Sequence, residues 1–272
     1  MTPLFDTHCH LQDPAFAGDA GPVLERAEAA GLAGMLLCGY DPPSNHAALE
    51  MAANSPLLFP AVGYHPHEAT DITPALLGEL ESLAALPAVV CVGEIGLDFF
   101  RDHSPRETQA RIFSAQLEIA IRVGKPVSVH TRGAEDASYD HLVRFSAARR
   151  WKTGMPPVGV MHCFGGTLEQ AQAYSAIGFA ISFACPVTYP GNERARTIAA
   201  AIPLESIVVE TDSPYLPPQS LRGQRNEPAN VRSAVAAVAA ARGSSENAVA
   251  EATTNNAARV FGVRLAAGVG PS

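Results

Sequence analysis

Short apolar runs alternate with helix-forming stretches along the whole chain, and this alternation constrains the fold more than any other feature of the sequence. Runs of strand length separated by segments of helical period are typical of βαβ units and a parallel sheet. Eight such runs favour a closed (β/α)8 barrel over an open doubly wound sheet. The expected strands are Leu4–His8, Gly34–Cys38, Leu58–Val62, Val89–Gly93, Val127–His130, Gly159–His162, Ala180–Phe183 and Ser206–Glu210.

Helix-forming stretches lie between these runs, and two more follow the last one. The clearest are Val23–Ala30, Pro105–Val123, Leu168–Ile177 and Asn192–Ala201, with Pro228–Ala241 and Glu246–Phe261 expected at the C-terminal end. The pattern predicts an α/β fold, a (β/α)8 barrel of the TIM type with additional C-terminal helices. We expect the 272 residues to form a single domain, 1–272 with a core of about 4–262.

Composition and the N-terminal residues restrict where such a protein works. No apolar run approaches the roughly 20 residues needed to span a bilayer, and Asp6, His8 and His10 fall where a secretory signal would be apolar. We therefore expect a cytoplasmic protein with no membrane partner. The five scattered cysteines favour buried, reduced thiols over a disulfide framework or a zinc ribbon. The net charge of −8 argues against binding nucleic acid through a broad basic surface.

Side chains able to bind metal ions stand at the ends of five expected strands. Asp6, His8 and His10 alternate along the first strand and so share one face. The carboxyl ends of barrel strands meet at one face, where active sites are built from several strands. Each of these histidines alone could be a hydrogen-bonded core residue. The presence of such side chains at the ends of five strands favours a common site. The residues at the other strand ends are Glu94, His130, His162 and Asp212.

The number of these side chains predicts two metal ions. Four histidines and two carboxylates exceed the protein ligands of one catalytic zinc ion. They suit a pair of ions about 3.5–4 Å apart bridged by a carboxylate. Glu94 is the expected bridge, because it has two oxygens and comes from a middle strand. The expected ligands are His8, His10, Glu94, His130, His162 and Asp212.

Short motifs spread over nearly the whole chain, from Asp6 to about Gly262, resemble the TatD family of metal-dependent DNases in order and spacing. An Asp-x-His-x-His motif alone also occurs in other amidohydrolase-like barrels, so the specificity lies in the combination. The motifs are Asp6–His10, Gly63–Pro66, Gly93–Asp98, Val129–Arg132, His162–Phe164, Glu210–Leu216 and Arg225–Pro228.

The resemblance implies a hydrolase of DNA phosphodiester bonds, expected to be an exonuclease, with two divalent ions. It implies that one ion is held by His8, His10 and Asp212, and that the other is held by His130 and His162. Glu94 would touch both ions. Substrate contacts implied by the same resemblance are His65, for a phosphate, and more weakly Arg132, Arg225 and Asn226. Histidine-rich ligation favours zinc, manganese or cobalt, whereas the family is commonly described as using magnesium.

The expected mechanism is attack on phosphorus by a hydroxide held between the ions, since such ions lower the pKa of water to near 7. Glu94 and Asp212 are the expected catalytic residues, with Asp212 accepting a proton from the attacking water. Asp6 and Asp98 are candidates for orienting the histidine rings. For Asp98, bracing the loop that follows is an equal alternative.

Two other classes of function stay open. The same dinuclear site would serve a hydrolase of amides, esters or phosphotriesters, although such enzymes often use a bridging carboxylated lysine where this chain has Glu94. A metal-binding scaffold protein with little turnover is the second alternative. For a nuclease, the net charge favours DNA ends or single strands over long duplexes, and the oligomeric state stays open. The Arg149–Gly154 segment is either a DNA-stacking edge or, as favoured, a solvated loop above a packed Trp151.

Overall fold

The computed structural model describes residues 2–265, which contain one sheet of eight parallel strands in the order β1 to β8. This order confirms the predicted barrel, because every strand pairs with the next one along the chain. Met1 and residues 266–272, which belong to the expected domain of 1–272, lie outside the described residues. The strands are β1 (Leu4–Cys9), β2 (Leu32–Cys38), β3 (Leu58–Val62), β4 (Cys91–Asp98), β5 (Val127–Arg132), β6 (Gly159–Met161), β7 (Phe179–Phe183) and β8 (Ile207–Val209).

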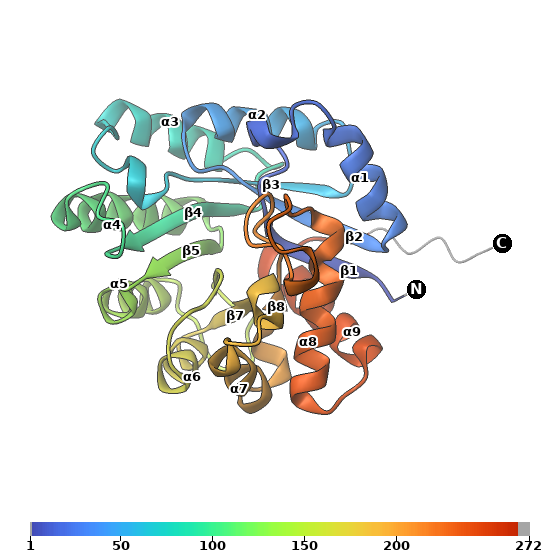
Figure 1. The fold of residues 1–272 in the computed structure, drawn as a ribbon. Helices are drawn as coiled ribbons and strands as arrows, with labels where there is room; N and C mark the ends of the chain where they lie inside the picture. Colours follow the sequence, from blue (N-terminus) through green and yellow to red (C-terminus); the bar gives the residue numbers. More distant parts are fainter. Residues whose placement is uncertain (1, 266–272) are drawn as a thin grey trace.

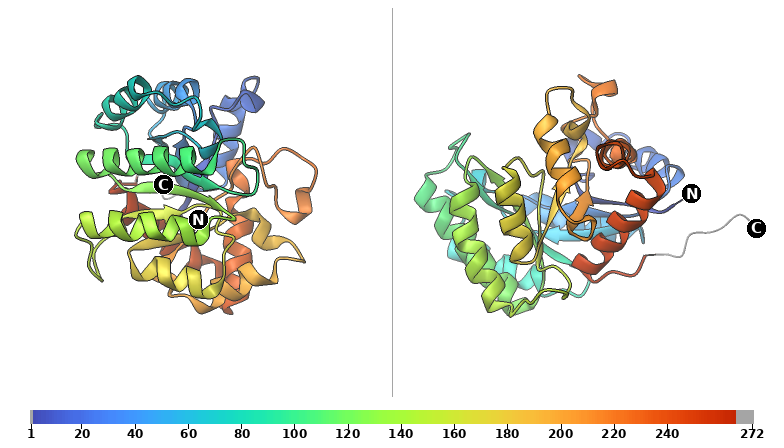
Figure 2. Two further views of the ribbon diagram at one scale, coloured as in Figure 1. Left: turned by 90° about the vertical axis from the view of Figure 1, so that its left-hand side faces the viewer. Right: turned by 90° about the horizontal axis from the view of Figure 1, so that it is seen from below.

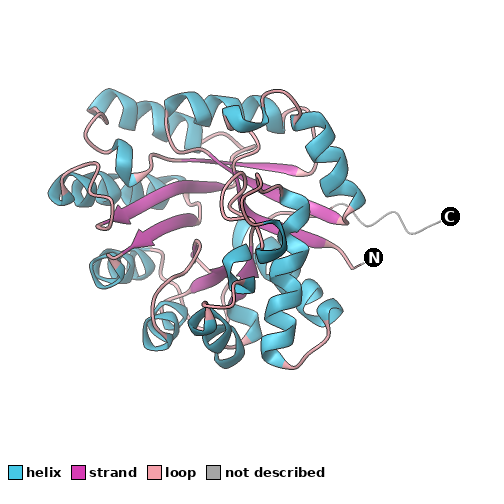
Figure 3. Cartoon of the chain, in the orientation of Figure 1, coloured by secondary structure: helices cyan, strands magenta, loops and turns pink. Residues whose placement is uncertain are grey.

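Helices connect successive strands and cover the outside of the sheet, as Figures 1 and 3 show. Neighbouring helices pack against one another around the barrel, and α4 and α5 lie side by side in Figure 2. The two helices predicted after the last strand are α8 and α9. The helices are α1 (Ala20–Ala29), α2 (Pro42–Ala52), α3 (Pro74–Ala84), α4 (Arg106–Val123), α5 (Glu135–Ala148), α6 (Leu168–Ala176), α7 (Glu193–Ala201), α8 (Val231–Arg242) and α9 (Glu246–Phe261).

Apolar side chains fill one end of the barrel interior. Phe5 of β1 stacks on Phe59 of β3 and on Phe261 of α9, with ring centroids 5.7 and 5.9 Å apart respectively. Inward-facing residues of β2, β4, β6, β7 and β8 belong to the same buried cluster. Helix α9 therefore covers this end of the barrel. The opposite end, at the carboxyl ends of the strands, is left for a site.

The barrel closes between β1 and the residues that follow β8. The backbone N–H of Asp212 donates to the carbonyl of His8 at 2.9 Å, and that of His10 donates to the carbonyl of Ser213 at 2.8 Å. Cys9 and Ser213 form an isolated parallel bridge at the same place. This closure holds Asp212 against the end of β1, so residues about 200 positions apart in sequence meet at one end of the barrel.

The predicted end of the fourth strand at Gly93 is wrong, because β4 continues to Asp98. Glu94 therefore lies within the strand. The pairing of β4 with β5 shifts between Val92 and Ile95, and the strand continues past Gly93. Gly96 pairs with His130 at a φ of +149°, and a Cβ at this position would collide with the carbonyl oxygen of His130. Only glycine allows this close approach.

The Arg149–Gly154 segment precedes β6, so it lies away from the end of the barrel where the strands terminate. The Trp151 ring packs on Gly178, where a Cβ would clash with it, and its Nε1 donates to the carbonyl of Pro156 at 3.2 Å. The favoured prediction of a packed tryptophan is therefore confirmed. All five cysteines are free, as predicted.

Within residues 2–265, every helix is too short or too polar to cross a membrane.

Candidate metal centre

The strands end at a cavity of about 930 Å³, and the predicted metal ligands gather in it. His8 is fully buried beneath the cavity, next to the lining residues. The contributing segments are the ends of β1 and β5, the middle of β4, and the residues just after β6 and β8. The lining includes His10, Glu94, His130, His162 and Asp212.

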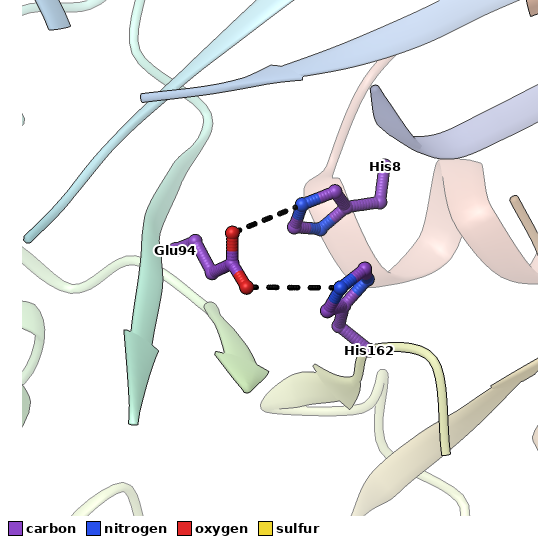
Figure 4. A group of neighbouring side chains, drawn as sticks. All are labelled: His8, Glu94 and His162. Atoms are coloured by element: carbon purple, nitrogen blue, oxygen red, sulfur yellow. Dashed lines mark ion pairs between the residues drawn. The ribbon is translucent and has the colours of Figure 1, made fainter. Parts of the chain in front are cut away.

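The two carboxylate oxygens of Glu94 face different histidines of the centre. Its Oε2 lies 3.3 Å from the Nε2 of His8 and 3.7 Å from the Nε2 of His10. Its Oε1 lies 3.1 Å from the Nδ1 of His130 and 3.7 Å from the Nε2 of His162. Figure 4 shows the two oxygens directed at His8 and His162. One carboxylate thus faces a different pair of imidazoles with each oxygen, which is the geometry required of a bridge between two cations.

Among residues 2–265, three groups of three side chains have ligand atoms close enough to hold a metal ion. Within each group, these atoms all lie within 4.8 Å of one another. The first group is His8, His10 and Asp212, which is also the set implied for one ion. The other two groups share Glu94. One adds His8 and His162, and the other adds His65 and His130.

Hydrogen bonds to the outer ring nitrogens orient the histidines of β1. The Nδ1 of His10 donates to the carbonyl of Cys38 at 2.7 Å, which fixes the proton on that nitrogen. Its Nε2 is the nitrogen left for a metal ion, facing Glu94 and lying 3.6 Å from Asp212 Oδ1. The Nδ1 of His8 lies 3.3 Å from Ser128 Oγ, which leaves the Nε2 of His8 toward Glu94. A ligand histidine is typically held in this way by its other nitrogen.

His130 and His162 are held by carboxylates instead. Asp98 Oδ2 lies 3.3 Å from the Nε2 of His130, and Glu210 Oε1 lies 2.8 Å from the Nδ1 of His162. In each ring the other nitrogen faces Glu94. The four imidazoles therefore direct ring nitrogens at the carboxylates of Glu94 and Asp212. Among residues 2–265, no Lys or Arg forms an ion pair with the carboxylates of this centre. A buried set of imidazoles and carboxylates of this kind fits divalent cations.

The electrostatics of the centre favour positive charge. Burial alone would raise the pKa of Glu94, but His65 and His8 beside it hold that pKa well below its usual range. Burial lowers the pKa of the His162 imidazole. The neighbouring carboxylates of Glu210 and Glu94 outweigh burial and raise this pKa to about 10. Without a metal ion, a proton on His162 partly balances the carboxylates. A bound cation would take over that role.

Asp6 does not orient a histidine ring, contrary to the expectation for it. Its carboxylate accepts hydrogen bonds from the backbone N–H of Thr211 at 2.9 Å, from the Thr211 hydroxyl at 2.5 Å and from the backbone N–H of His8 at 3.2 Å. Burial raises the pKa of Asp6 to about 8, against the effect of the Thr211 hydrogen bonds. Asp6 thus joins β1 to the turn that carries Asp212.

Two of the four residues expected to contact substrate line the cavity, His65 and Arg132. The Nδ1 of His65 accepts the backbone N–H of His67 at 3.1 Å, so its Nε2 carries the proton; this nitrogen lies 3.6 Å from Glu94 Oε1. The guanidinium carbon of Arg132 lies 4.0 Å from the centroid of the Phe100 ring.

The structure does not bring Arg225 and Asn226 into the cavity lining. Arg225 forms a two-pronged ion pair with Asp19, with N–O distances of 2.8 and 2.6 Å. Asn226 is fully buried, and its amide donates to the carbonyls of Thr211 and Leu216. Both side chains therefore hold the chain near the site in place.

Sequence reasoning missed several residues of the centre. Glu210 was read only as part of a motif, although it stands two positions before Asp212, directly after an apolar run. His67 follows His65 with the same spacing, and its Nε2 lies 2.9 Å from Asp98 Oδ2. His103 packs against His67, with ring centroids 4.5 Å apart, but it carries no signal in the sequence.

Comparison with known proteins places the chain in a family. The model of the TatD related DNase family matches residues 5–262. An uncharacterized metal-dependent hydrolase, YabD of Bacillus subtilis strain 168, is 34% identical over 95% of this chain and 98% of its own length. A 3'-5' ssDNA/RNA exonuclease, TatD of Klebsiella pneumoniae strain 342, is 35% identical over 96% of this chain and 98% of its own length.

A solved structure gives the same result. The crystal structure of YJJV, a TatD homologue from Escherichia coli K12, superposes with a TM-score of 0.88 at 32% identity, covering 96% of this chain and 98% of that one. Family model, relatives and structure agree over nearly the full length. The chain is therefore a member of the TatD related DNase family of metal-dependent hydrolases.

Proposed function

We propose that this protein is a metal-dependent exonuclease that removes nucleotides from the ends of single-stranded DNA or RNA, using two divalent ions bridged by Glu94. The observation that carries the proposal is the division of the Glu94 carboxylate, with Oε2 toward His8 and His10 and Oε1 toward His130 and His162. Relatives named as single-strand exonucleases support the substrate class and the 3'-to-5' direction.

The residues assigned to the ions are those of the candidate metal centre. His8, His10 and Asp212 would hold one ion, and His130 and His162 the other, with Glu94 shared. Bound divalent ions would polarise the scissile phosphate and lower the pKa of a coordinated water. Magnesium, manganese and zinc are the candidate ions.

Asp212 is suited to accept a proton from the attacking water. Burial raises its pKa, but the hydrogen bond from His10 and the charge of His162 hold the pKa below its usual value. Its carboxylate is therefore ionised at neutral pH. Asp212 lies in the lining of the cavity, within reach of substrate and solvent.

His65 is suited to donate a hydrogen bond to a phosphate oxygen. Its proton lies on Nε2 because Nδ1 accepts the N–H of His67. Burial holds the pKa of His65 well below its usual value, so the ring is neutral at pH 7. A neutral donor fixed in a buried site stabilises the charge that develops on phosphate oxygens in the transition state.

Cationic side chains in the cavity match an anionic polymer. Arg101, Arg132 and Arg194 line it, and none has a carboxylate within 4.0 Å in the part of the chain that the structure describes. Elsewhere Arg26 and Arg225 are paired with acidic partners. An acidic protein can thus bind phosphates through a few local arginines.

The position of the lysines disfavours the amide, ester or phosphotriester alternative. The chain has two lysines, Lys125 and Lys152. Lys125 donates to the carbonyls of Ala84 and Leu86 ahead of β5, and Lys152 lies ahead of β6. Neither can be the bridging carboxylated lysine of those enzymes.

The test is hydrolysis of end-labelled single-stranded and duplex DNA and RNA after removal of metal with EDTA. Magnesium, manganese, zinc or cobalt is then added back one at a time. The proposal expects metal-dependent release of mononucleotides from single strands. Absence of cleavage with every ion would refute it, provided that the protein is shown to bind two ions. Hydrolysis of a small amide or ester instead would revive the alternative.

A further inference from the structure

An exposed aromatic ring lies beside the cavity. Phe100 is 67% exposed, the highest value among the exposed large apolar side chains of residues 2–265. It follows β4 directly, next to Arg101, which lines the cavity. Tyr215, the other exposed Phe, Tyr or Trp side chain in the same range at 54%, lines the cavity. Exposed aromatic rings gathered at one opening are typical of a binding surface.

The Phe100 ring is backed by a cation. The guanidinium carbon of Arg132 lies 4.0 Å from the ring centroid, on one face of the ring. Arg132 has no carboxylate within 4.0 Å among the described residues, so its charge is left for a ligand. Phe100 is nevertheless largely exposed to solvent. Phe100 together with this guanidinium is called the Phe100 platform below.

Backbone hydrogen bonds tie the platform to the metal centre. Asp98 Oδ1 accepts the N–H groups of Phe100 and Arg101, both at 2.9 Å, while Oδ2 of the same carboxylate lies 3.3 Å from His130 Nε2. The N–H of Phe99 donates to the carbonyl of Arg132 at 2.9 Å. The backbone of the platform is thus held in a fixed position relative to His130, so a bound nucleic acid need not order it.

The distance from the centre suits a neighbouring nucleotide. Arg132 stands two residues beyond His130 on β5, and Phe100 stands two residues beyond Asp98 on β4. At about 3.3 Å per strand residue, Arg132 lies roughly 7 Å further out than His130, and Phe100 lies beside Arg132 in the turn that follows β4. A phosphate at the metal centre would therefore place the base of an adjacent nucleotide near the ring.

We propose that the Phe100 platform stacks with one unpaired base of the nucleic acid, next to the scissile linkage, while Arg132 attracts the neighbouring phosphate. The proposal rests on the proposed function and adds a base-binding subsite to it. Stacking needs a base whose face is free, so a paired end must open before it can bind. Aromatic stacking accepts any base, so the subsite selects unpaired strands without selecting sequence.

The test compares variants on oligonucleotides that lack one base. Single strands with an abasic nucleotide at each of the first few positions from the 3' end are assayed for KM and kcat with the metal-loaded protein. Binding is measured by fluorescence anisotropy on the same strands with a phosphorothioate at the terminal linkage. The variants are Phe100→Ala, Phe100→Trp and, as control, Leu86→Ala. Leu86 is 41% exposed but lies ahead of β4, away from the cavity.

When the base at one position is missing, we expect the affinity of wild type to fall roughly tenfold and its KM to rise to the same degree. Phe100→Ala should bind the complete strand about as weakly as wild type binds the abasic strand. Its affinity should not change further when the base is missing. Phe100→Trp should restore the discrimination, and Leu86→Ala should match wild type. Hydrolysis of bis(4-nitrophenyl) phosphate should be the same in wild type and Leu86→Ala.

Two results overturn the inference in different ways. If wild type cleaves single strands and Phe100→Ala keeps the wild-type response to abasic nucleotides, the platform binds no base and the proposed function stands. If wild type neither binds nor cleaves any oligonucleotide, the proposed function fails and the platform fails with it.

Discussion

The Oε1 atom of Glu210 lies 2.8 Å from the Nδ1 of His162, and the same oxygen accepts the backbone N–H of Cys163 at 2.7 Å. The second oxygen, Oε2, accepts the hydroxyl of Ser182. Glu210 is completely buried. A carboxylate fixed by β7 and by the turn after β6 thus holds His162 with its Nε2 toward Glu94 and Asp212.

Replacing Glu210 should therefore weaken metal binding without removing a ligand. We expect Glu210→Gln to lower the affinity of the centre for its ions roughly 10- to 100-fold, as loss of such orienting partners typically does. Titration calorimetry with zinc or manganese measures this. Glu205→Gln, which changes an exposed glutamate a few residues away, is the matched control. Equal affinities in both variants would contradict a positioning role for Glu210.

Removing His130 should abolish most turnover while the barrel stays folded. His130 is partly exposed at the end of β5 and makes its contacts inside the cavity, with Glu94 and Asp98. We expect His130→Ala to lose at least about 100-fold in kcat for single-stranded DNA, with unchanged circular dichroism. Wild-type DNA hydrolysis at wild-type metal content would show that His130 is not a ligand of the centre.

His65 provides a test of ligand against substrate contact, because it lies in one of the candidate metal groups. With its proton on Nε2 it should donate to phosphate, so His65→Ala should lower kcat/KM about 100-fold and leave two ions bound per chain. Metal content by mass spectrometry is measured alongside kinetics. Loss of one ion in this variant would instead make His65 a metal ligand.

Asn226 should matter for stability more than for substrate binding. Its amide donates to Thr211 and Leu216 carbonyls, and its oxygen accepts the N–H of Glu227 and the side-chain amide of Asn230. Since Asn226→Ala leaves buried carbonyls unsatisfied, we expect it to lower the free energy of unfolding by about 2 kcal/mol. Urea denaturation of the metal-free protein measures this. A wild-type midpoint with a raised KM for DNA would restore Asn226 as a substrate contact.

The barrel and the ligand residue types were predictable because period and order are local properties of the sequence. Apolar runs ending in His130, His162 and Glu210 to Asp212 mark the strand ends at which barrel sites form. The course of β4 was not predictable, because Gly93 and Gly96 resemble strand breakers. Their real role, close approach to β5, depends on a partner strand far along the chain.

The partners of the predicted residues depend on tertiary contacts that the sequence does not show. For Asp98 both predicted roles hold, because it lies beside the His130 ring and accepts the backbone N–H groups of Phe100 and Arg101 in the loop that follows. Asp6 was expected to contact a ring and contacts Thr211 instead. Arg225 stood in a motif beside Asn226, yet its partner Asp19 lies 206 positions away. Spacing along the chain carries no information about such pairs.

The most direct test of the account is a titration of metal-stripped protein with manganese, in which bound ions per chain and the rate of single-strand DNA hydrolysis are followed together. Because Glu94 faces a different pair of histidines with each oxygen, we expect the rate to stay low at one ion per chain and to rise as the second site fills. Glu94→Ala should hold fewer ions and show no such rise. Full activity at one bound ion per chain would contradict the dinuclear centre.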